Sequence, residues 1–463
     1  MLHVATVAAL VLVGSDRSDF EKLCAADPTA FGPGFEQLHD SLGRTGKGTL
    51  EALANVSPLD KATILRSAAQ EVGVSPCPAA DAMDKATGLD PLTGCTPDSD
   101  RCTLTRINTD VVKALGAVSS PERRVVIAEI TGPGQLEMLS RVAWIHSLVL
   151  GGRDGNVDLK GISGFAQLRV LQLNNMVVPS LQPLGSLTQL QELRTSFLQS
   201  AGPLDLGFAA RTKKLAVLEL SASGVTADLA PLAKASALRV LRFVGVSAPS
   251  LVPLATLTGL VELGLPARVK GVTPTPVFGK KAGIVQYEST GGDLTAVAGL
   301  TSLEALDARG QGVSDLAPLA KLKKLKSLDL EWNRELKDLT PLAGLTALES
   351  LEISRTAVES LAPLARLVRL KSLRCDSTKV ATLGQLAKLT ALETLDLGGT
   401  PVTDVTPLAG LAQLRDLDLR DTRVTSLKPL FKLKHLMNVD LPRDLSDSER
   451  AAAQAAWPDV LLQ

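Results

Sequence analysis

Aliphatic residues recur through the last two thirds of the chain with a period of 21 to 25 residues. Each period holds two inward-facing aliphatic residues separated by one variable residue, which is the alternation of a short half-buried strand. Fourteen tandem copies make a repeat architecture the only economical reading, with strands stacked in parallel about 4.8 Å apart. The pairs begin at Leu148, Leu171, Leu193, Leu218, Leu241, Leu263, Val285, Leu306, Leu328, Leu351, Leu373, Leu395, Leu417 and Val439.

One copy written in full shows further regularities. Its characteristic positions are Leu389, Leu392, Leu395, Leu397, Thr400, Val402, Asp404, Val405, Pro407 and Leu408. This pattern resembles the leucine-rich repeats, and the recurring Pro-Leu is most similar to the bacterial internalin-type subclass. The resemblance implies an α/β fold, a leucine-rich repeat solenoid with a parallel concave sheet over residues 122–445, and recognition of a protein or peptide ligand through that sheet.

Three positions refine the repeat. Threonine recurs after the strand, as in Thr400, where asparagine stands once as Asn333; a threonine hydroxyl has less hydrogen-bonding capacity, so we expect a weaker ladder to the adjoining turn and coil. Proline before leucine, as in Pro318, suits the first turn of a short helix or 3₁₀ segment. Cys375 occupies an inward position and reads as a small buried hydrophobe.

Residues 16–121 lack the repeat and read as a small helical cap domain, with helices expected near residues 20–26, 57–72 and 110–117. An even number of cysteines in this segment favours two disulfides. Cys95 with Cys102 would close a short loop and leave Cys24 with Cys77, one of three connectivities. Residues 124–130 are expected to form the first strand of the array, or the strand that caps it.

The ends of the chain and two irregular stretches complete the organisation. Residues 1–15 form a candidate signal peptide, although their start contains no Lys or Arg; cleavage would make the protein secreted, periplasmic or cell-surface, and retention would make it cytoplasmic. Residues 446–463 read as a capping helix and tail. Residues 196–212 are loosened by Gly202-Pro203, and residues 266–283 are either a projecting binding loop or a degenerate copy.

Charge and composition exclude several function classes. Lysine plus arginine (49) equals aspartate plus glutamate (49), so net charge does not favour nucleic acid or an anionic membrane, and no stretch is long enough to span a bilayer. A P-loop-like run at residues 43–49 lacks the required glycine and Ser/Thr, and residues 154–165 lack the glycine and glutamate of a calcium loop. With four histidines and no paired nucleophile, we expect no enzyme, no cofactor and no metal site.

The variable residue between the two inward residues of each pair points out of the concave sheet, and we call these residues the middle column. Six of the seven in the C-terminal half are acidic, so they repel one another unless arginines on adjacent columns relieve them. The column reads Asp307, Asp329, Glu352, Arg374, Asp396, Asp418 and Asp440, with Arg309, Arg355 and Arg420 nearby. The alternatives are a solvated, self-neutralising face and a site for a basic ligand. In the N-terminal half the column shows no consistent sign: Gln172, Arg194, Glu219, Arg242, Gly264 and Gln286.

Trp332 follows Glu331 and should be partly exposed, which makes it a candidate hot spot beside the carboxylates. We therefore expect a monomeric, exported, non-catalytic binding protein for a protein or peptide ligand, with a basic one favoured. The alternative is an intracellular regulatory scaffold resembling the leucine-rich repeat subunit that controls a protein phosphatase. An enzyme hidden in residues 16–121 is a third hypothesis.

Overall fold

The computed structural model describes residues 101–104, 107–118, 124–132, 134–152, 157–200, 202–266 and 292–462, together with residue 25 and residues 92–93. The chain divides into two compact units, residues 1–167 with 174–177, and residues 168–173 with 178–463. The candidate site lies wholly in the second unit.

The first unit contains a small sheet. β1 (Leu92–Thr93) is antiparallel to β2 (Arg101–Leu104), whereas β2, β3 (Val125–Ile130) and β4 (Ser147–Gly152) are parallel. The strand expected at residues 124–130 is therefore confirmed as β3, and parallel pairing begins one strand earlier than the repeat pattern indicates. The connections hold α7 (Thr109–Gly116), α8 (Gln135–Leu139) and the 3₁₀ segment η3 (Leu159–Gly164).

Local capping explains where two of these connections start. The side chain of Asn108 accepts a hydrogen bond from the Val111 N–H at 2.9 Å, and α7 begins there, at the position where a helix was expected. Asp158, from the calcium-like stretch, instead accepts from the Lys160 N–H at 3.0 Å and caps η3. The P-loop-like run, Cys24, Cys77 and Cys95 lie outside the described residues. Cys102 is buried in β2, and its pairing stays a prediction.

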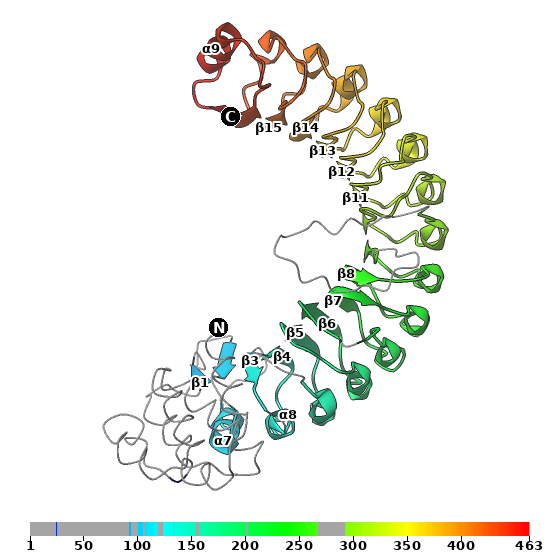
Figure 1. Ribbon diagram of the computed structural model, residues 1–463, viewed down its shortest axis with the longest axis vertical. Coiled ribbons are helices and arrows are strands. Elements are labelled where there is room, and N and C mark those ends of the chain that lie inside the picture. The colour runs from blue at the N-terminus through cyan, green and yellow to red at the C-terminus, as the bar shows by residue number, and fades with distance from the viewer. Residues whose placement is uncertain are drawn as a thin grey trace, which may run out of the picture. The chain divides into compact units, whose positions relative to one another are not determined.

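In the second unit, strands alternate with 3₁₀ turns that face the opposite side of each coil (Figure 1). The strands are β5 (Val170–Asn174), β6 (Glu192–Ser196), β7 (Val217–Thr226), β8 (Val240–Ser247), β9 (Glu262–Gly264), β10 (Ala305–Asp307), β11 (Ser327–Asp329), β12 (Ser350–Glu352), β13 (Ser372–Arg374), β14 (Thr394–Asp396), β15 (Asp416–Asp418), β16 (Asn438–Asp440) and β17 (Leu461–Leu462).

Short 3₁₀ segments replace full helices, as the recurring proline predicts. Eight of them carry that proline in their first two positions, where its missing N–H leaves no bond unmade; the copy with Gln385 forms the same turn without it. They are η4 (Gln182–Ser186), η5 (Gly207–Ala210), η6 (Ala230–Lys234), η7 (Val252–Thr256), η8 (Thr295–Val297), η9 (Ala317–Leu319), η10 (Thr340–Gly344), η11 (Ala362–Arg366), η12 (Gly384–Lys388), η13 (Thr406–Leu408) and η14 (Lys428–Leu430).

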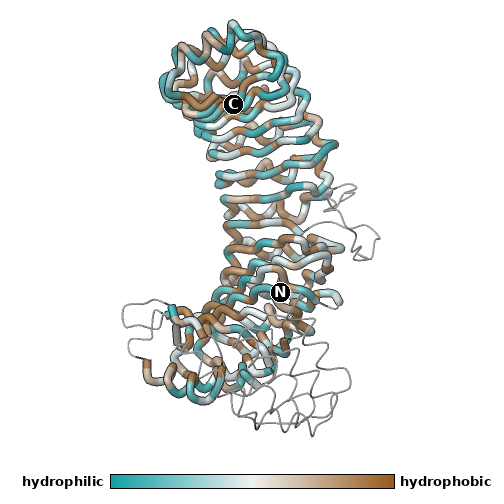
Figure 2. Tube along the Cα trace, turned by 60° about the vertical axis from the view of Figure 1, so that its left-hand side comes forward, coloured by the Kyte–Doolittle hydropathy of each residue, from teal (hydrophilic) through white to brown (hydrophobic). Residues whose placement is uncertain are grey.

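The leucine pattern predicts the strand register correctly. The first inward residues face one another across successive parallel strands, from Leu306 with Leu328 to Leu417 with Val439, and each is at most 2% exposed. Burial of one such side chain contributes about 2 kcal/mol. Figure 2 shows the resulting alternation of hydrophobic and hydrophilic positions along each coil.

The copy expected at Val285 is wrong. β9 pairs directly with β10, Leu263 facing Leu306, and the Leu265 N–H donates to the Asp307 carbonyl at 2.9 Å. In the described residues the sheet therefore passes from β9 to β10 without the copy expected at Val285. Residues 267–291, which contain Gln286 and the basic residues Arg268, Lys270, Lys280 and Lys281 of the proposed loop, lie outside the described residues. Residues 202–212 of the other irregular stretch stay in the stack through the bridge of Leu204 with Ala227.

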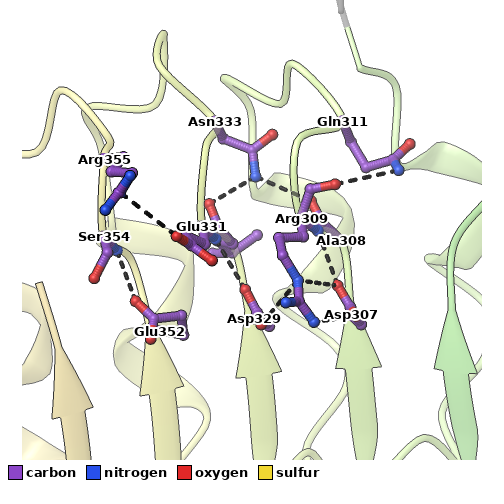
Figure 3. Close-up of polar contacts among 11 residues, drawn as sticks. Asp307, Ala308, Arg309, Gln311, Asp329, Glu331, Asn333, Glu352, Ser354 and Arg355 are labelled. Carbon is purple, nitrogen blue, oxygen red and sulfur yellow. Dashed lines mark hydrogen bonds and ion pairs between the residues drawn. The ribbon is translucent and has the colours of Figure 1, made fainter. Parts of the chain in front are cut away.

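The threonine ladder is weaker than the asparagine one, as expected. Asn333 donates to the carbonyls of Leu330 at 2.7 Å and Ala308 at 3.0 Å, and it accepts from the Val313 N–H at 2.8 Å, so it ties its coil to the preceding one (Figure 3). The expectation that threonine also bonds the adjoining coil is not met, because each hydroxyl donates only to a carbonyl of its own turn. These hydroxyls belong to Thr356, Thr378, Thr400 and Thr422.

The C-terminal end is closed by α9 (Asp447–Ala456). Ser446 accepts from the Glu449 N–H at 3.3 Å, which confirms the predicted capping helix, and Trp457 packs edge-on against Phe431 with ring centroids 5.3 Å apart. Cys375 is a free, fully buried thiol, and burial raises its pKa, as expected for a core residue. In the described part of the chain, no helix has the length and apolarity to cross a bilayer.

Candidate functional site

The middle column is a physical row in the structure. Successive strands from β10 to β16 place these residues directly opposite one another in the parallel register. At the usual spacing of about 4.8 Å between strands, neighbouring like charges repel. The row is Asp307, Asp329, Glu352, Arg374, Asp396, Asp418 and Asp440, so their predicted register is confirmed, and their role in binding stays a prediction.

Most of these carboxylates also cap the turn after their strand, a role that the sequence reading missed. Each accepts a hydrogen bond from the backbone N–H two residues later, at distances from 2.8 to 3.1 Å. The five are Asp307, Asp329, Glu352, Asp396 and Asp418. Asp440 has no such donor because residue 442 is proline. The sequence did carry a signal for this capping role, because an acidic residue recurs two positions before the turn that follows the strand.

Two arginines neutralise part of the column. Arg309 lies between Asp307 and Asp329, with nitrogen to oxygen distances of 2.8 and 3.3 Å (Figure 3). Arg420 donates to Asp418 at 2.9 Å and lies 3.8 Å from Asp440. The hydrogen bond to the adjacent aspartate raises the pKa of each guanidinium. At these two places the expected relief is confirmed.

The middle of the column is not relieved in this way. Arg355 pairs outside the column, with Glu331 at 3.6 Å and Asp376 at 3.8 Å. Arg374 stands between Glu352 and Asp396 in the register, yet within residues 292–462 it has no carboxylate within 4 Å. Glu352 and Asp396 likewise have no cation within that distance in the same range.

Burial acts on the same carboxyl groups. Desolvation is the largest cause that raises the pKa of Asp329, Glu331, Glu352 and Asp396, although backbone hydrogen bonds or arginines lower it in part. Their charged forms are therefore held at a cost that a cationic ligand would reduce.

An open depression of about 390 Å³ lies over the C-terminal part of this face. Seven carboxylates but only two guanidinium groups line it, so its charge is strongly negative. The charged lining residues are Glu331, Glu352, Arg374, Asp376, Asp396, Asp416, Asp418, Arg420 and Asp440. Asp416 and Asp376 were not among the predicted residues; each lies two residues from the middle-column residue of its own coil.

Trp332 sits beside the depression rather than in its lining. Its backbone is left-handed (φ 63°) and its side chain is half-buried, so the predicted partial exposure is confirmed. The guanidinium carbons of Arg355 and Arg334 lie 4.6 and 5.2 Å from its ring centroid. The protein's own cations therefore already occupy the ring, which removes the simplest way for Trp332 to bind a foreign cation.

The stacked register can be compared with known proteins. No protein-family model matches the sequence, and no curated protein sequence does. Solved structures do match. An internalin from Listeria monocytogenes has a TM-score of 0.58 and 22% identity over 78% of this chain and 99% of its own. A leucine-rich repeat protein from Leptospira interrogans has a TM-score of 0.58 and 16% identity over 78% of this chain and 100% of its own.

This chain is a leucine-rich repeat protein. At these identities the likeness extends to the fold, and the site must be argued from this chain's own residues. In the described part of this leucine-rich repeat protein, no cluster of three or more His, Cys, Asp or Glu side chains is arranged to hold a metal ion.

The N-terminal stretch of the same column has a different charge pattern, which the sequence reading described only as inconsistent in sign. Arg194, Glu219 and Arg242 face one another on β6, β7 and β8. Glu219 accepts from both arginines at 3.0 Å, and each arginine also pairs with a glutamate at the start of a strand, Glu192 or Glu262. We call this the balanced stretch, and β10 to β16 the acidic stretch.

Proposed function

We propose that this leucine-rich repeat protein is a non-catalytic binding module whose acidic depression captures a basic segment of a protein or peptide. The observation that carries the proposal is the surplus of carboxylates lining the depression, among which Glu352 and Asp396 have no cation within 4 Å in residues 292–462.

A cation fits this site for an energetic reason. Glu352 and Asp396 are partly desolvated, and burial raises their pKa, so an ammonium or guanidinium group placed beside them would replace lost hydration. Long-range attraction by the negative face would also speed encounter with a basic partner, and salt would weaken it. Because Arg374 stands between the two carboxylates, the ligand's cations would bind on either side of it.

The size of the depression favours a segment over a large rigid surface. A volume of about 390 Å³ falls in the range of small-molecule and short-peptide pockets. The row of carboxylates runs along the stack of strands, so an extended chain laid along it would present successive basic side chains to successive coils.

Charge-neutral variants test the proposal. Glu352→Gln, Asp396→Asn and Asp440→Asn together remove three charges, and the first two keep the side-chain acceptor that caps the turn. We expect the Kd for a fluorescein-labelled octalysine peptide, measured by anisotropy, to rise at least tenfold, as for loss of charge pairs worth about 0.5 kcal/mol each. The matched control is Glu304→Gln, Glu349→Gln and Glu393→Gln, which removes three carboxylates outside the depression. Equal losses in both variants, or none in the first, would contradict a site in the depression.

We further propose that the protein is exported and carries two disulfides in its N-terminal region, which distinguishes it from an intracellular regulatory scaffold. The support is the apolar stretch of residues 2–14 and the even number of cysteines before residue 103. Mass measurement of the natively produced protein with and without reduction before alkylation separates the two. Export predicts a shortened N-terminus and one alkylated thiol after unfolding without reduction; an intact start with five alkylated thiols would favour the scaffold.

A further inference from the structure

A second charged surface lies on the side of each coil that leads into its strand. Residues two, four, five and seven positions before the first inward leucine alternate with fully buried leucines such as Leu322 and Leu325, so they point to solvent. Between η9 and β16 eleven of them are lysine or arginine, all exposed, and we call these the basic edge. They are Lys321, Lys323, Lys324, Lys326, Arg366, Arg369, Lys371, Lys388, Arg415, Lys432 and Lys434.

These residues lie on the same side of the stack because the coils stay in register before the strands begin. The Lys326 N–H donates to the Glu304 carbonyl at 2.8 Å, and the same bond recurs at each step as far as the Met437 N–H, which donates to the Arg415 carbonyl at 2.8 Å. The Lys323 Nζ reaches the Gly344 carbonyl of the following coil at 3.1 Å. The cations are concentrated in three copies, with four before Leu328, three before Leu373 and two before Val439. The copies of Leu395 and Leu417 add one each, and the copy of Leu351 adds none.

Most of this positive charge is not neutralised. Lys326 pairs with Glu304 at 2.7 Å and Lys371 with Glu349 at 2.8 Å, and the other nine cations have no carboxylate within 4 Å in residues 292–462. Glu393 is the third acidic residue at these positions. The net charge of zero thus conceals a segregation, with a negative depression and a positive edge on one unit.

Exposed apolar side chains lie among these cations. Val368, between Arg366 and Arg369 in sequence, is 55% exposed, and Met437, three residues after Lys434, is 56% exposed. Leu461 is 54% exposed and its N–H donates to the Met437 carbonyl at 2.8 Å, so it extends the apolar surface at the C-terminal end. Bulky aliphatic groups surrounded by lysine and arginine are the composition of surfaces that bind the interface of anionic bilayers.

We propose that the basic edge docks the protein peripherally on an anionic lipid surface, with lysine and arginine contacting lipid phosphates and Val368, Met437 and Leu461 entering the headgroup region. Phe, Tyr and Trp are absent from these positions, and His435 is the one aromatic side chain there that could stack on a base, which favours lipid over single-stranded nucleic acid. This surface is separate from the depression, so each of the two proposals can fail alone.

Sedimentation with vesicles tests the proposal on the full chain. We expect binding to phosphatidylcholine vesicles containing 30% phosphatidylglycerol and none to pure phosphatidylcholine. Lys324→Glu, Arg369→Glu and Lys434→Glu together should lower the partition coefficient at least about a hundredfold, since each cation near an anionic surface contributes a factor of about five and each new glutamate adds repulsion. Val368→Ser with Met437→Ser should lower the residual binding at 0.5 M salt severalfold.

The control reverses the same number of charges on the side of the coil that follows the strand, with Lys337→Glu, Lys379→Glu and Arg423→Glu. This variant should keep at least half of the free energy of binding, and circular dichroism would establish that both variants are folded. Absence of binding to anionic vesicles, or an equal loss in both variants, would overturn the proposal. So would retention on heparin or single-stranded RNA without retention on vesicles.

Discussion

The balanced and acidic stretches occupy the same position of the repeat but treat charge in opposite ways. In the balanced stretch Arg194, Glu219 and Arg242 alternate in sign and pair with one another at 3.0 Å. In the acidic stretch only Arg374 interrupts a row of carboxylates, and it makes no ion pair within residues 292–462. The fold therefore accepts a neutral middle column and does not require an acidic one.

Turn capping does not account for the difference. The capping bond needs a side-chain oxygen two residues before the N–H, and an asparagine or glutamine oxygen accepts as well as a carboxylate. In the balanced stretch Thr195, next to the middle column, has a different role: its hydroxyl accepts from the Ser221 N–H of the following coil at 2.9 Å and so links two coils. The carboxylates of the acidic stretch thus supply a charge beyond what the turn needs, which is why we assign that charge to ligand binding.

The largest change in folding stability should come from removing the alternation of charge in the balanced stretch. Glu219→Lys removes two ion pairs and places three cations in register, so we expect a loss of about 2 kcal/mol from two lost attractions and two new repulsions. Hydrogen exchange with mass spectrometry should locate the faster exchange in β6 to β8, because coils contact mainly their neighbours. Glu219→Gln, which adds no repulsion, should cost about half as much. Equal exchange in wild type and Glu219→Lys would mean that these pairs contribute nothing.

Lowering the pH from 7 to 5 should stabilise the acidic stretch, whereas Glu219→Lys destabilises the balanced stretch. Burial raises the pKa of Asp329, Glu331, Glu352 and Asp396 in the folded protein, so protonation favours the fold. The stabilisation is complete below the unfolded pKa values and is lost as the pH rises through the folded ones. We expect Tm to rise by about 2 °C from pH 7 to pH 5.

Further acidification should reverse that trend. The hydrogen bond from Lys371 lowers the pKa of Glu349, so this pair stabilises the fold only while Glu349 is ionised. A Tm that falls steadily from pH 7 to pH 5 would show that carboxylates of this second kind dominate the described coils.

The smallest effect should come from a single neutralisation in the acidic stretch. Asp396→Asn keeps the acceptor for the Gly398 N–H, now 3.0 Å away, and removes repulsion from Asp418, so we expect a gain of about 0.5 kcal/mol. Urea denaturation in 20 mM and 500 mM salt would measure it, and the gain should shrink at high salt. A destabilised Asp396→Asn would show that the charge strengthens the turn more than the row repels it.

The register of the fold was predictable because it follows from local periodicity. A Leu-x-Leu pair every 22 residues fixes which side chains face inward, and every such pair from Leu306 to Leu417 stacks as expected. Val285 fits the same local pattern, yet β9 pairs past it, since pairing is decided by the whole stack. β2 was missed because a cysteine stands at its first inward position, although Cys102 lies 24 residues before Val126, its partner in β3.

The site was predictable in position but not in its contacts. Alternation along a strand places Asp329 and Asp396 on the concave face, whereas the reach of an arginine depends on its rotamer and on the next coil. Arg309 bridges two carboxylates, Arg374 pairs with none in residues 292–462, and Arg355 turns toward Trp332. The net charge of zero also could not show that the depression is negative and the basic edge positive, because a net charge does not depend on where the charges lie.

The hydrogen bonds of Asn333 determine where along the array the coils can unfold separately from one another. Asn333 joins its coil to the one before it through Ala308 and Val313, and the four threonines at the same position make no bond to a neighbouring coil. Local unfolding that starts at α9 and proceeds toward the N-terminus should therefore be resisted most at β11, the second strand after residues 267–291. The coils that carry the depression lie on the C-terminal side of β11, so a ligand seated there would act as a clamp on the most easily opened part of the array.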